Sequence, residues 1–343
     1  MQSLGLDVGG ANTKAVLLKD GEMQKHWLKY LPLWKDKKAL DYFLNVLAKS
    51  ARPNVVGATL TGELCDVFSS RREGVVEIVE AVCNAFGDEI CLFMSLDGTL
   101  LTRDQSLTSP QKLAAANWVA STLVVGKKYP NCLFIDVGST TTDIIPVRRG
   151  KPVPIGHTDL QRLRTGELVY MGVLRTPLPC ICSEVSLSGE KIGVAAENFA
   201  IAADIYRVLG MIKEGDYTCE TPDGVEKDRK GCMQRIARVF CSDVEEIGEE
   251  QILEAAKIFH DKQTNHVAGA LKKVIRLHRI PRSTKIVMAG LGRMILAEKA
   301  ARAAGFNEII DLATIYGEEA ALMTPAFSAG LLATGAFEHG CRD

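Results

Sequence analysis

The chain has 343 residues, of which 47 % are hydrophobic and 24 % charged, with a formal net charge of −1. This length accommodates two domains with cores of their own, and the composition is ordinary for a soluble globular protein. A net charge near zero argues against non-specific nucleic-acid binding, which needs a concentrated positive surface. No apolar run approaches the ~20 residues that span a bilayer, and no signal-peptide pattern opens the chain. We therefore expect a cytoplasmic protein with no nucleic-acid or membrane partner.

The first half of the chain alternates strand-like and helix-like segments. A hairpin is predicted from strands at 5–8 and 15–18, around a Gly-rich turn. Helical periodicity then alternates with buried strands, the helices at 40–50, 74–86 and 109–124 and the strands at 55–60 and 90–94. The polar segment 127–131 breaks this pattern, so we place a domain boundary between residues 129 and 130.

The second half begins with another hairpin, and its middle is polar and irregular at 157–182. Helical patterns follow at 197–209, 233–240, 249–278, 294–304 and 326–337, and a buried strand at 285–292 ends in a third Gly turn. The alternation predicts the α/β class. The predicted domains are 1–129, closed by a C-terminal helix at about 325–343, and 130–324, with an insertion at about 157–232.

Two Gly-rich turns nearly repeat each other. Residues 5–14 read Gly-Leu-Asp-Val-Gly-Gly-Ala-Asn-Thr-Lys, and residues 135–143 read Ile-Asp-Val-Gly-Ser-Thr-Thr-Thr-Asp. In each, an apolar strand ends in an Asp before a turn with hydroxyl or amide side chains. Gly exposes backbone N–H groups that can cradle an anion, and the Asp can hold a hydrated Mg²⁺ that bridges to phosphate oxygens. The repeat predicts two phosphate-holding half-sites.

The residues of the two turns divide into metal ligands and phosphate contacts. We expect Asp7 and Asp136 to ligate Mg²⁺, directly or through water, rather than only to accept backbone hydrogen bonds. Lys14 is a candidate point charge on a diphosphate, with a solvated hairpin lysine as the alternative. The expected phosphate contacts are Gly9, Gly10, Asn12, Thr13, Gly138, Ser139, Thr140, Thr141 and Thr142, and Asp143 is assigned an orienting role.

The order of these signals resembles the actin/sugar-kinase/Hsp70 superfamily over essentially the whole chain. The resemblance rests on the two Asp-Gly turns and on the third turn at 289–292. It implies two actin-like, ribonuclease H-like domains facing a central cleft. Within the superfamily, the amino-acid sequence resembles the hydantoinase/oxoprolinase-like group in the segments 5–14, 60–64, 134–143 and 165–177.

This second resemblance also implies an activity, because it points to group members from methanofuran-dependent one-carbon pathways. The implied reaction condenses (5-(aminomethyl)furan-3-yl)methyl diphosphate with γ-glutamyltyramine, forms an aryl ether and releases pyrophosphate with the help of Mg²⁺. The implied partners are thus small-molecule substrates, and homo-oligomerisation stays open.

The third turn departs from the nucleotide-binding relatives, because it carries Leu291 and Arg293. Bulky side chains there would obstruct an adenine pocket, which favours a diphosphate substrate over ATP. The alternatives are an ATP-dependent small-molecule kinase or oxoprolinase-type enzyme on the same fold, and a non-catalytic, nucleotide-binding regulator or assembly protein of the actin type.

Glu63 follows Thr61-Gly62 at the end of a predicted strand. It is a candidate general base toward the phenol, whose unperturbed pKa is ~10, or an added metal contact. The alternative is a capping carboxylate near a helix N-terminus.

The polar segment that starts at residue 157 concentrates ionisable groups. Arg162, Arg164 and Arg175 are candidate bidentate donors to the diphosphate or to the glutamyl carboxylates. Asp159 and Glu167 either belong to the same substrate site or pair with these arginines in a structural network. We expect at least one of the arginines to bind substrate.

The ten cysteines are scattered along the chain, and we expect them to be reduced and semi-buried. Cys180 and Cys182, together with Cys219, Cys232 and Cys241, could hold zinc, although their spacing is not that of paired C-x₂-C knuckles. Cys180 and Cys182 equally suit one face of a buried strand.

Overall fold

The computed structural model describes residues 1–338, and the chain separates into two compact units. The first contains Met1–Phe134, Ile145–Asp159 and the chain from Asp311 onward. The second contains Ile135–Ile144 and Leu160–Ile310. The chain therefore first leaves unit 1 after Phe134, within a strand, rather than at the polar break near residue 129.

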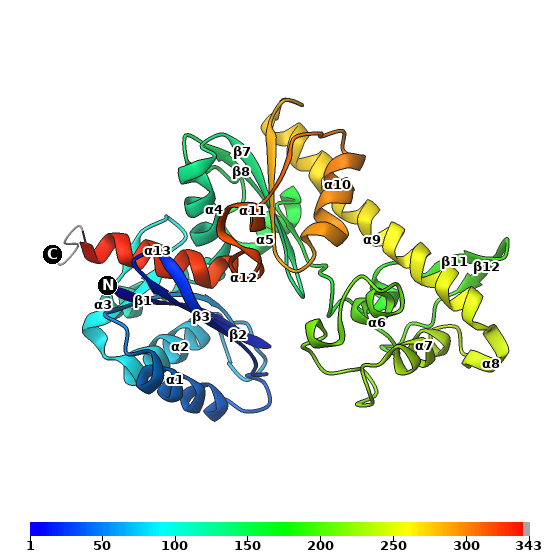
Figure 1. Ribbon diagram of the computed structural model, residues 1–343, viewed down its shortest axis with the longest axis horizontal. Helices are drawn as coiled ribbons and strands as arrows, with labels where there is room; N and C mark the ends of the chain where they lie inside the picture. The colour runs from blue at the N-terminus through cyan, green and yellow to red at the C-terminus, as the bar shows by residue number, and fades with distance from the viewer. Residues whose placement is uncertain (339–343) are drawn as a thin grey trace. The chain divides into compact units, whose positions relative to one another are not determined.

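A six-stranded sheet forms the centre of the first unit, in the order β3-β2-β1-β4-β5-β6 (Figure 1). Its strands are β1 (Gln2–Gly9), β2 (Asn12–Lys19), β3 (Glu22–Tyr30), β4 (Val55–Thr61), β5 (Cys91–Met94) and β6 (Leu100–Leu101). The first three are antiparallel neighbours, whereas β4 is parallel to β1 and β5 is parallel to β4. The edge strand β3 was not predicted, because most of its residues are polar and exposed.

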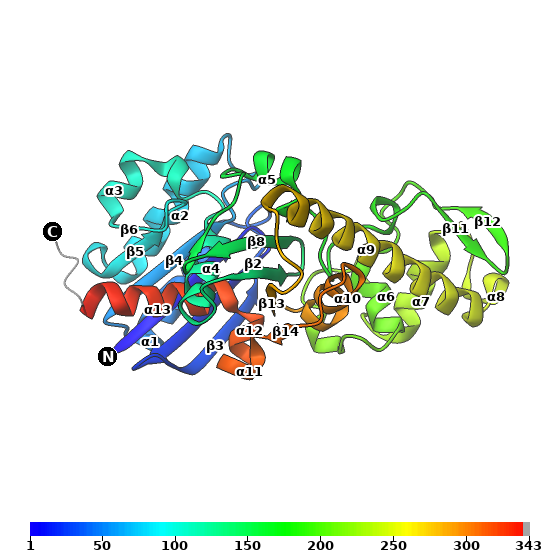
Figure 2. The same cartoon turned by 90° about the horizontal axis from the view of Figure 1, so that it is seen from above.

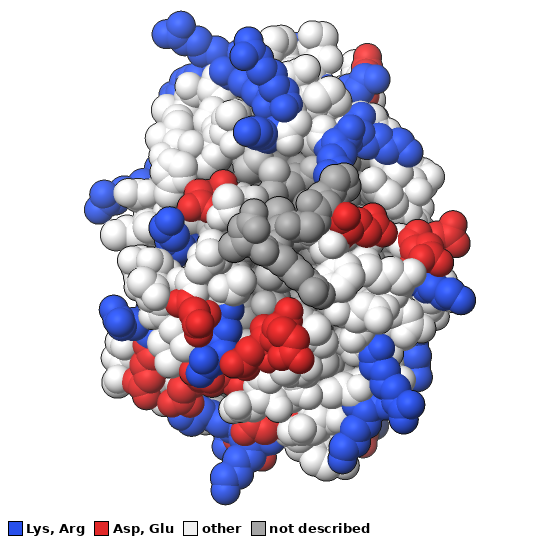
Figure 3. All heavy atoms as spheres, turned by 90° about the vertical axis from the view of Figure 1, so that its left-hand side faces the viewer, with Lys and Arg blue, Asp and Glu red and all other residues white. Residues whose placement is uncertain are grey.

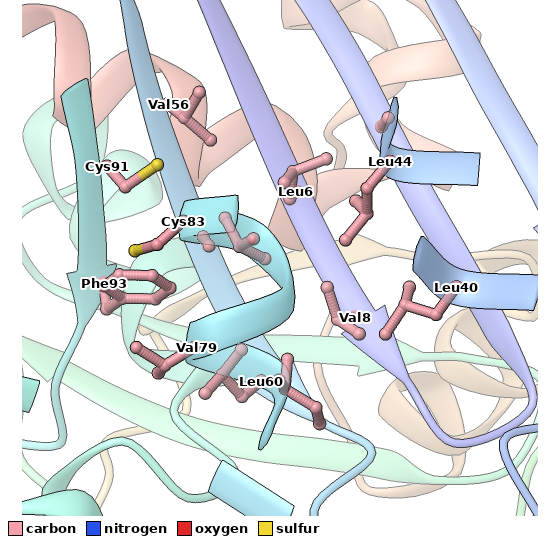
Figure 4. Packing of buried hydrophobic residues seen from close by; sticks show 14 of the residues in the cluster. Leu6, Val8, Leu40, Leu44, Val56, Leu60, Val79, Cys83, Cys91 and Phe93 are labelled. Carbon is pink, nitrogen blue, oxygen red and sulfur yellow. The ribbon is translucent and has the colours of Figure 1, made fainter. Parts of the chain in front are cut away.

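Two amphipathic helices, α1 (Lys38–Ala51) and α2 (Arg71–Phe86), cover one face of this sheet. Figure 4 shows Leu6 and Val8 of β1 close to Leu40 and Leu44 of α1. All four side chains are buried, as is Val79 of α2 in the same cluster. Burial of such a side chain contributes roughly 1.5–3 kcal/mol to the stability of the fold. The residues of α1 and α2 that face the sheet are apolar, and this is the periodicity that predicted both helices.

Helix α13 (Thr324–Glu338) packs on β1, β2 and β4. The contact with β1 is close enough that a Cβ atom on Gly5 would lie 1.8 Å from the carbonyl oxygen of Ala326. The closing helix predicted at 326–337 is confirmed, while residues 339–343 of its expected extension lie outside the described part of the chain. The remaining helices of this unit are α3 (Arg103–Thr108), α4 (Asn117–Lys128), α11 (Ala313–Tyr316) and α12 (Glu318–Leu322).

The helix predicted at 109–124 is wrong in its first half. Only a short 3₁₀ turn forms at Pro110–Lys112, and α4 begins at Asn117. Between them, Ala114 makes a parallel bridge to Leu60, and Ala115 adopts a left-handed φ of +53°. This tertiary contact with the end of β4 overrides the helix propensity of the alanine run.

The second sheet has the order β10-β8-β7-β13-β14, with β9 paired to β8. Its strands are β7 (Cys132–Val137), β8 (Thr142–Arg148), β9 (Lys151–Pro152), β10 (Leu168–Val169), β13 (Lys285–Ala289) and β14 (Ile309–Asp311). Like the first sheet it contains a strand–turn–strand hairpin at the predicted Gly-rich turn. The expected α/β class is therefore confirmed.

The long helix α9 (Glu249–His278) organises the helices of the second unit (Figure 2). It contacts α6 (Ala202–Val208), α7 (Arg229–Arg238), α8 (Val244–Ile247), α10 (Glu298–Ala303) and the hairpin strand β11 (Glu184–Leu187), whose partner is β12 (Glu190–Gly193). The segment 157–182, expected to be irregular, contains α5 (Asp159–Thr165) and β10. The helix predicted at 294–304 begins as a π-helical turn, Arg293–Ala297.

Within residues 1–338, no helix has the length and apolar character needed to cross a membrane. Lysine and arginine side chains are interspersed with aspartate and glutamate on the face shown in Figure 3. This mixture agrees with a net charge of −1.

Candidate functional site

The first Gly-rich turn joins β1 to β2 and lies beside the carboxyl end of β4. Asp7 stands opposite Lys14 in the antiparallel pair and opposite Thr59 in the parallel pair. Downstream of β3, Leu33 fixes the turn from outside, because its N–H donates to the carbonyl of Gly10 at 2.9 Å. The hairpin and the neighbouring parallel strand thus place the Asp near the end of the sheet at which the Gly-rich turn lies.

Asp7 is a buried carboxylate, with 5 % of its surface exposed. The hydroxyl of Thr59 donates to its Oδ1 at 3.1 Å, and Lys14 Nζ lies 3.7 Å from its Oδ2. Burial raises the pKa of Asp7, while Lys14 and hydrogen bonds from Thr59 and Thr61 act in the opposite direction. Lys14 is therefore paired to the Asp across the hairpin rather than being a freely solvated lysine.

Two further oxygen atoms of this turn have no hydrogen-bond partner although they are buried. These are Asn12 Oδ1 and Thr13 Oγ1. An unpaired buried polar atom costs about 1–3 kcal/mol, so such atoms call for a bound group that satisfies them. A carboxylate, an amide oxygen and a hydroxyl are hard oxygen ligands, and this set fits a hydrated Mg²⁺.

The second Gly-rich turn joins β7 to β8 and is braced by the segment 171–176. Within the turn, the N–H of Gly138 donates to the carbonyl of Thr141 at 2.9 Å. From the brace, the N–H of Val173 donates to Gly138 O at 3.1 Å, and that of Arg175 donates to Ser139 O at 2.9 Å. The side chain of Thr142 also bonds to this segment, at Met171 O. The turn is thus held by a hydrogen bond of its own and by hydrogen bonds to the segment 171–176. The hydroxyl oxygens of Ser139 and Thr140 lie 3.4 Å apart.

The third Gly turn lies directly against Asp136. Asp136 is 9 % exposed, and a Cβ on Gly290, whose φ is +85°, would come within 2.4 Å of its Oδ1. The N–H of Gly292 donates at 2.9 Å to the carbonyl of the residue after Asp136. Arg293 is buried, and its Nη1 donates back to Gly290 O at 3.3 Å. Leu291 is partly buried. Both bulky residues singled out in the sequence therefore belong to the packing of this turn.

Glu63 is 1 % exposed and sits two residues beyond the end of β4. Its Oε1 lies 3.5 Å from Arg71 Nε, and its Oε2 is buried without a hydrogen-bond partner. Burial raises the pKa of Glu63 to about 7, against the opposing effects of backbone hydrogen bonds and of Arg71. The capping alternative is wrong, because Ser70 caps α2 by accepting from the N–H of Glu73.

The arginine-rich segment contains one arginine with internal partners and one that is exposed. Arg162 is 1 % exposed, and its Nη2 donates to Asp143 Oδ1 at 2.5 Å and to the carbonyl of Glu167 at 3.1 Å. The Glu167 carboxylate is itself 2.7 Å from His278 Nε2. These contacts favour the structural network over a substrate role for Arg162 and Glu167. Arg164, by contrast, is exposed.

The other two members of the predicted substrate set are Asp159 and Arg175. Asp159 Oδ2 accepts from Arg71 at 2.9 Å, which links it to Glu63. Arg175 is partly buried and reaches the second Gly turn through its backbone. Its guanidinium also lowers the pKa of the buried Cys219 thiol, which burial raises to about 11.

Comparison with known proteins places the chain in a family. The model of the hydantoinase/oxoprolinase family matches residues 54–324. The chain belongs to this family. A curated relative from Methanocaldococcus jannaschii is 34 % identical over 332 residues, which is 96 % of each chain. A second, from Methanococcus vannielii, is 38 % identical over 204 residues, covering 59 % of this chain and 90 % of its own.

Both relatives are named (4-{4-[2-(γ-L-glutamylamino)ethyl]phenoxymethyl}furan-2-yl)methanamine synthase. Among solved structures, a ROK family glucokinase from Streptomyces griseus, in complex with glucose and AMPPNP, has a TM-score of 0.49. It is 12 % identical and covers 98 % of this chain and 100 % of its own.

The cysteine pair of this family member does not form the strand face that its spacing suggested. Cys180 ends a 3₁₀ turn, Leu178–Cys180, and is exposed, while Cys182 is partly buried. Among residues 1–338, no three His, Cys, Asp or Glu side chains converge to hold a metal ion. Cys341 lies outside the described residues.

Three residues of the site were missed in the sequence. Thr59 and Arg71 contact the predicted carboxylates, and the buried Gln263 of α9 donates to the carbonyl of Gly172 in the brace at 2.9 Å. Thr59 could have been found from the parallel register of β1 and β4. No local pattern connects Gln263 with a turn more than 100 residues away.

Proposed function

We propose that this chain condenses (5-(aminomethyl)furan-3-yl)methyl diphosphate with γ-glutamyltyramine, forming an aryl ether and releasing pyrophosphate. The observation that carries the proposal is the 34 % identity, over 96 % of both chains, to a synthase whose name describes this ether. The substrates are small molecules, and we place the reaction in the cytoplasm.

The two Gly-rich turns suit the leaving diphosphate. Each supplies one buried carboxylate, Asp7 or Asp136, and backbone N–H groups that can hold phosphate oxygens. We assign both carboxylates to Mg²⁺, directly or through water; when bound, the ion would neutralise the charge of the departing pyrophosphate. Lys14 and the unpaired oxygens of Asn12 and Thr13 complete the first half of this arrangement.

An ATP-dependent kinase or oxoprolinase-type enzyme is the competing function on this fold. The third Gly turn supports the diphosphate substrate instead. Arg293 folds back onto Gly290 in a position where the nucleotide-binding relatives are expected to have small residues. A non-catalytic, nucleotide-binding regulator of the actin type is disfavoured by the 34 % identity to a named synthase.

The experiment is a product assay with the purified full-length chain, both substrates and Mg²⁺. We expect the ether and pyrophosphate in equal amounts by mass spectrometry, without ATP, and no product after chelation of the metal. Asp7→Asn and Asp136→Asn should each lower kcat/KM on the order of 100-fold and raise the Mg²⁺ concentration needed. The exposed Asp104→Asn is the matched control. ADP formed from ATP, with no ether, would overturn the proposal.

A further inference from the structure

The ether can form only if the phenol loses its proton, and we propose that Glu63 is the base, with Arg71 as its positioning residue. This inference rests on the proposed function. It adds the identity of the group that activates the nucleophile, which the reaction alone does not specify.

The first observation is an incomplete set of hydrogen bonds around a buried carboxylate. Arg71 Nε approaches Oε1 of Glu63, and Oε2 has no partner although it is buried. A buried, unpaired carboxylate oxygen is costly in a folded protein. A phenol hydroxyl donating to Oε2 would supply the missing bond, which is the contact that a general base must make.

The second observation is a strained backbone that contributes to the same carboxylate. The backbone of Ala115 acts to lower the pKa of Glu63 and so favours its charged form. Ala115 has a φ of +53°, a left-handed conformation that is strained for a residue with a Cβ atom. The adjacent bridge between Ala114 and Leu60 holds this conformation against the end of β4. Strain of this kind is typical of functional sites.

The third observation is the position of Glu63 relative to the first Gly-rich turn. In the parallel pair of β1 and β4, Gly9 stands opposite Thr61, two residues before Glu63. A Cβ on Gly10 would lie 3.9 Å from the Cα of Gly62. The backbone that carries Glu63 is therefore in contact with the turn that we assign to the diphosphate.

The charged groups facing Glu63 come from two elements. Arg71, in the first turn of α2, attracts the carboxylate, but it also pairs with Asp159 at the start of α5, at 2.9 Å. Asp159 in turn repels Glu63. Because Arg71 is shared, burial prevails and raises the pKa of Glu63 to about 7. A base with this pKa is partly ionised near neutral pH and still takes up a proton readily.

The step balances without any further reactant. The phenol proton passes to the Glu63 carboxylate, and the phenol oxygen uses its electron pair to bond the CH₂ carbon of the furan diphosphate. The bond from that carbon to the diphosphate oxygen breaks, and its electron pair leaves with pyrophosphate. Glu63 then returns its proton to water.

The decisive test varies the acidity of the phenol. Glu63→Gln keeps the size of the side chain and removes its basicity, so the rate with γ-glutamyltyramine should fall by roughly 100- to 10,000-fold. A ring-difluorinated analogue, assayed at a pH where its phenol ionises unaided, should recover most of the rate. The KM for the furan diphosphate should stay unchanged.

An equal loss with both phenols, or no loss, would overturn the role of Glu63. Ether formation by the wild-type chain is measured alongside; if that is absent, the proposed function itself fails. If the wild-type chain makes the ether and Glu63→Gln makes it equally fast from γ-glutamyltyramine, the proposed function stands and the role of Glu63 as the base is refuted.

Arg71 is tested by the pH profile, which a purely structural residue would not shift. Arg71→Met removes the attraction that favours the charged carboxylate, so the acidic limb of kcat/KM should move to higher pH, and Arg71→Lys should restore part of the shift. The neighbouring Arg72 is exposed, and Arg72→Met is the matched control. An unmoved acidic limb in Arg71→Met would contradict the positioning role, whatever the behaviour of Glu63→Gln.

Discussion

At the scale of single residues, Glu63 makes the stability of the fold depend on pH. Burial raises its pKa from 4.5 to about 7, so the folded chain keeps a proton that the unfolded chain has released between these values. The stability associated with Glu63 is therefore full below about pH 4.5 and is lost as the pH rises to about 7. The full loss is on the order of 3 kcal/mol.

Urea unfolding of the wild type and Glu63→Gln, near pH 5 and near pH 8, measures this effect. The variant should gain stability relative to the wild type at the higher pH by on the order of 3 kcal/mol, but little at the lower one. Glu22→Gln, an exposed carboxylate of β3 in the same unit, should show no such difference. The same stability gap at both pH values would mean that Glu63 is ionised normally in the folded chain.

Residues that belong to a repeated sequence motif could be selected as candidates from the sequence. Asp7 and Asp136 stand out in the sequence because the Asp-Gly turn occurs twice, and both side chains are buried, while their metal role stays a prediction. Arg162 was harder to interpret, because its partner Asp143 lies 19 residues away and their ion pair is buried. An arginine-rich sequence looks the same whether its side chains bind substrate or one another.

At the scale of elements, α9 supports the second Gly-rich turn through a buried amide. Gln263 Nε2 donates to Gly172 O at 2.9 Å, and its Oε1 accepts from the Tyr206 hydroxyl at 2.7 Å. A Cβ on Gly172 would lie 2.5 Å from the peptide of Ser139 and Thr140, so the brace touches the turn itself. The helix thereby helps to fix the backbone that we assign to phosphate oxygens.

Replacing this amide should weaken binding as well as stability. Gln263→Leu removes one hydrogen bond from Gly172 O and one from the Tyr206 hydroxyl, at about 0.5–1.5 kcal/mol per bond, while Thr176 Oγ1 still donates to Gly172 O at 3.0 Å. The loss should raise the KM for the furan diphosphate severalfold. Gln251→Leu, near the N-terminus of α9, should leave the KM unchanged. Steady-state kinetics decides, and a Gln263→Leu variant that is destabilised with an unaltered KM would show that α9 supports only the fold.

Helices with a clear apolar face could be predicted, whereas those that respond to a distant contact could not. The periodicity of residues 249–278 marks α9 as helical over its full length. The alanine run at 114–116 has high helix propensity, yet Ala114 pairs with Leu60 instead. Tertiary contacts of this kind override the intrinsic helix propensity of a short segment, and they cannot be seen in the local sequence.

At the scale of the whole molecule, the chain enters and leaves each unit more than once. The second unit takes Ile135–Ile144, with the second Gly-rich turn, and then the long stretch Leu160–Ile310. The sequence predicted a boundary near residue 129 because the polar segment 127–131 interrupts the pattern of strands and helices. The division itself depends on which strands pair, and β13 joins the second sheet from about 150 residues beyond β7.

The central claim is that a phenol oxygen displaces a diphosphate at carbon, and an isotope label tests it most directly. γ-Glutamyltyramine carrying ¹⁸O in its phenol is incubated with the furan diphosphate, Mg²⁺ and the full-length chain, and the products are weighed by mass spectrometry. The account predicts all of the label in the ether and none in pyrophosphate. Label bound to phosphorus, or an ether without it, would contradict the account.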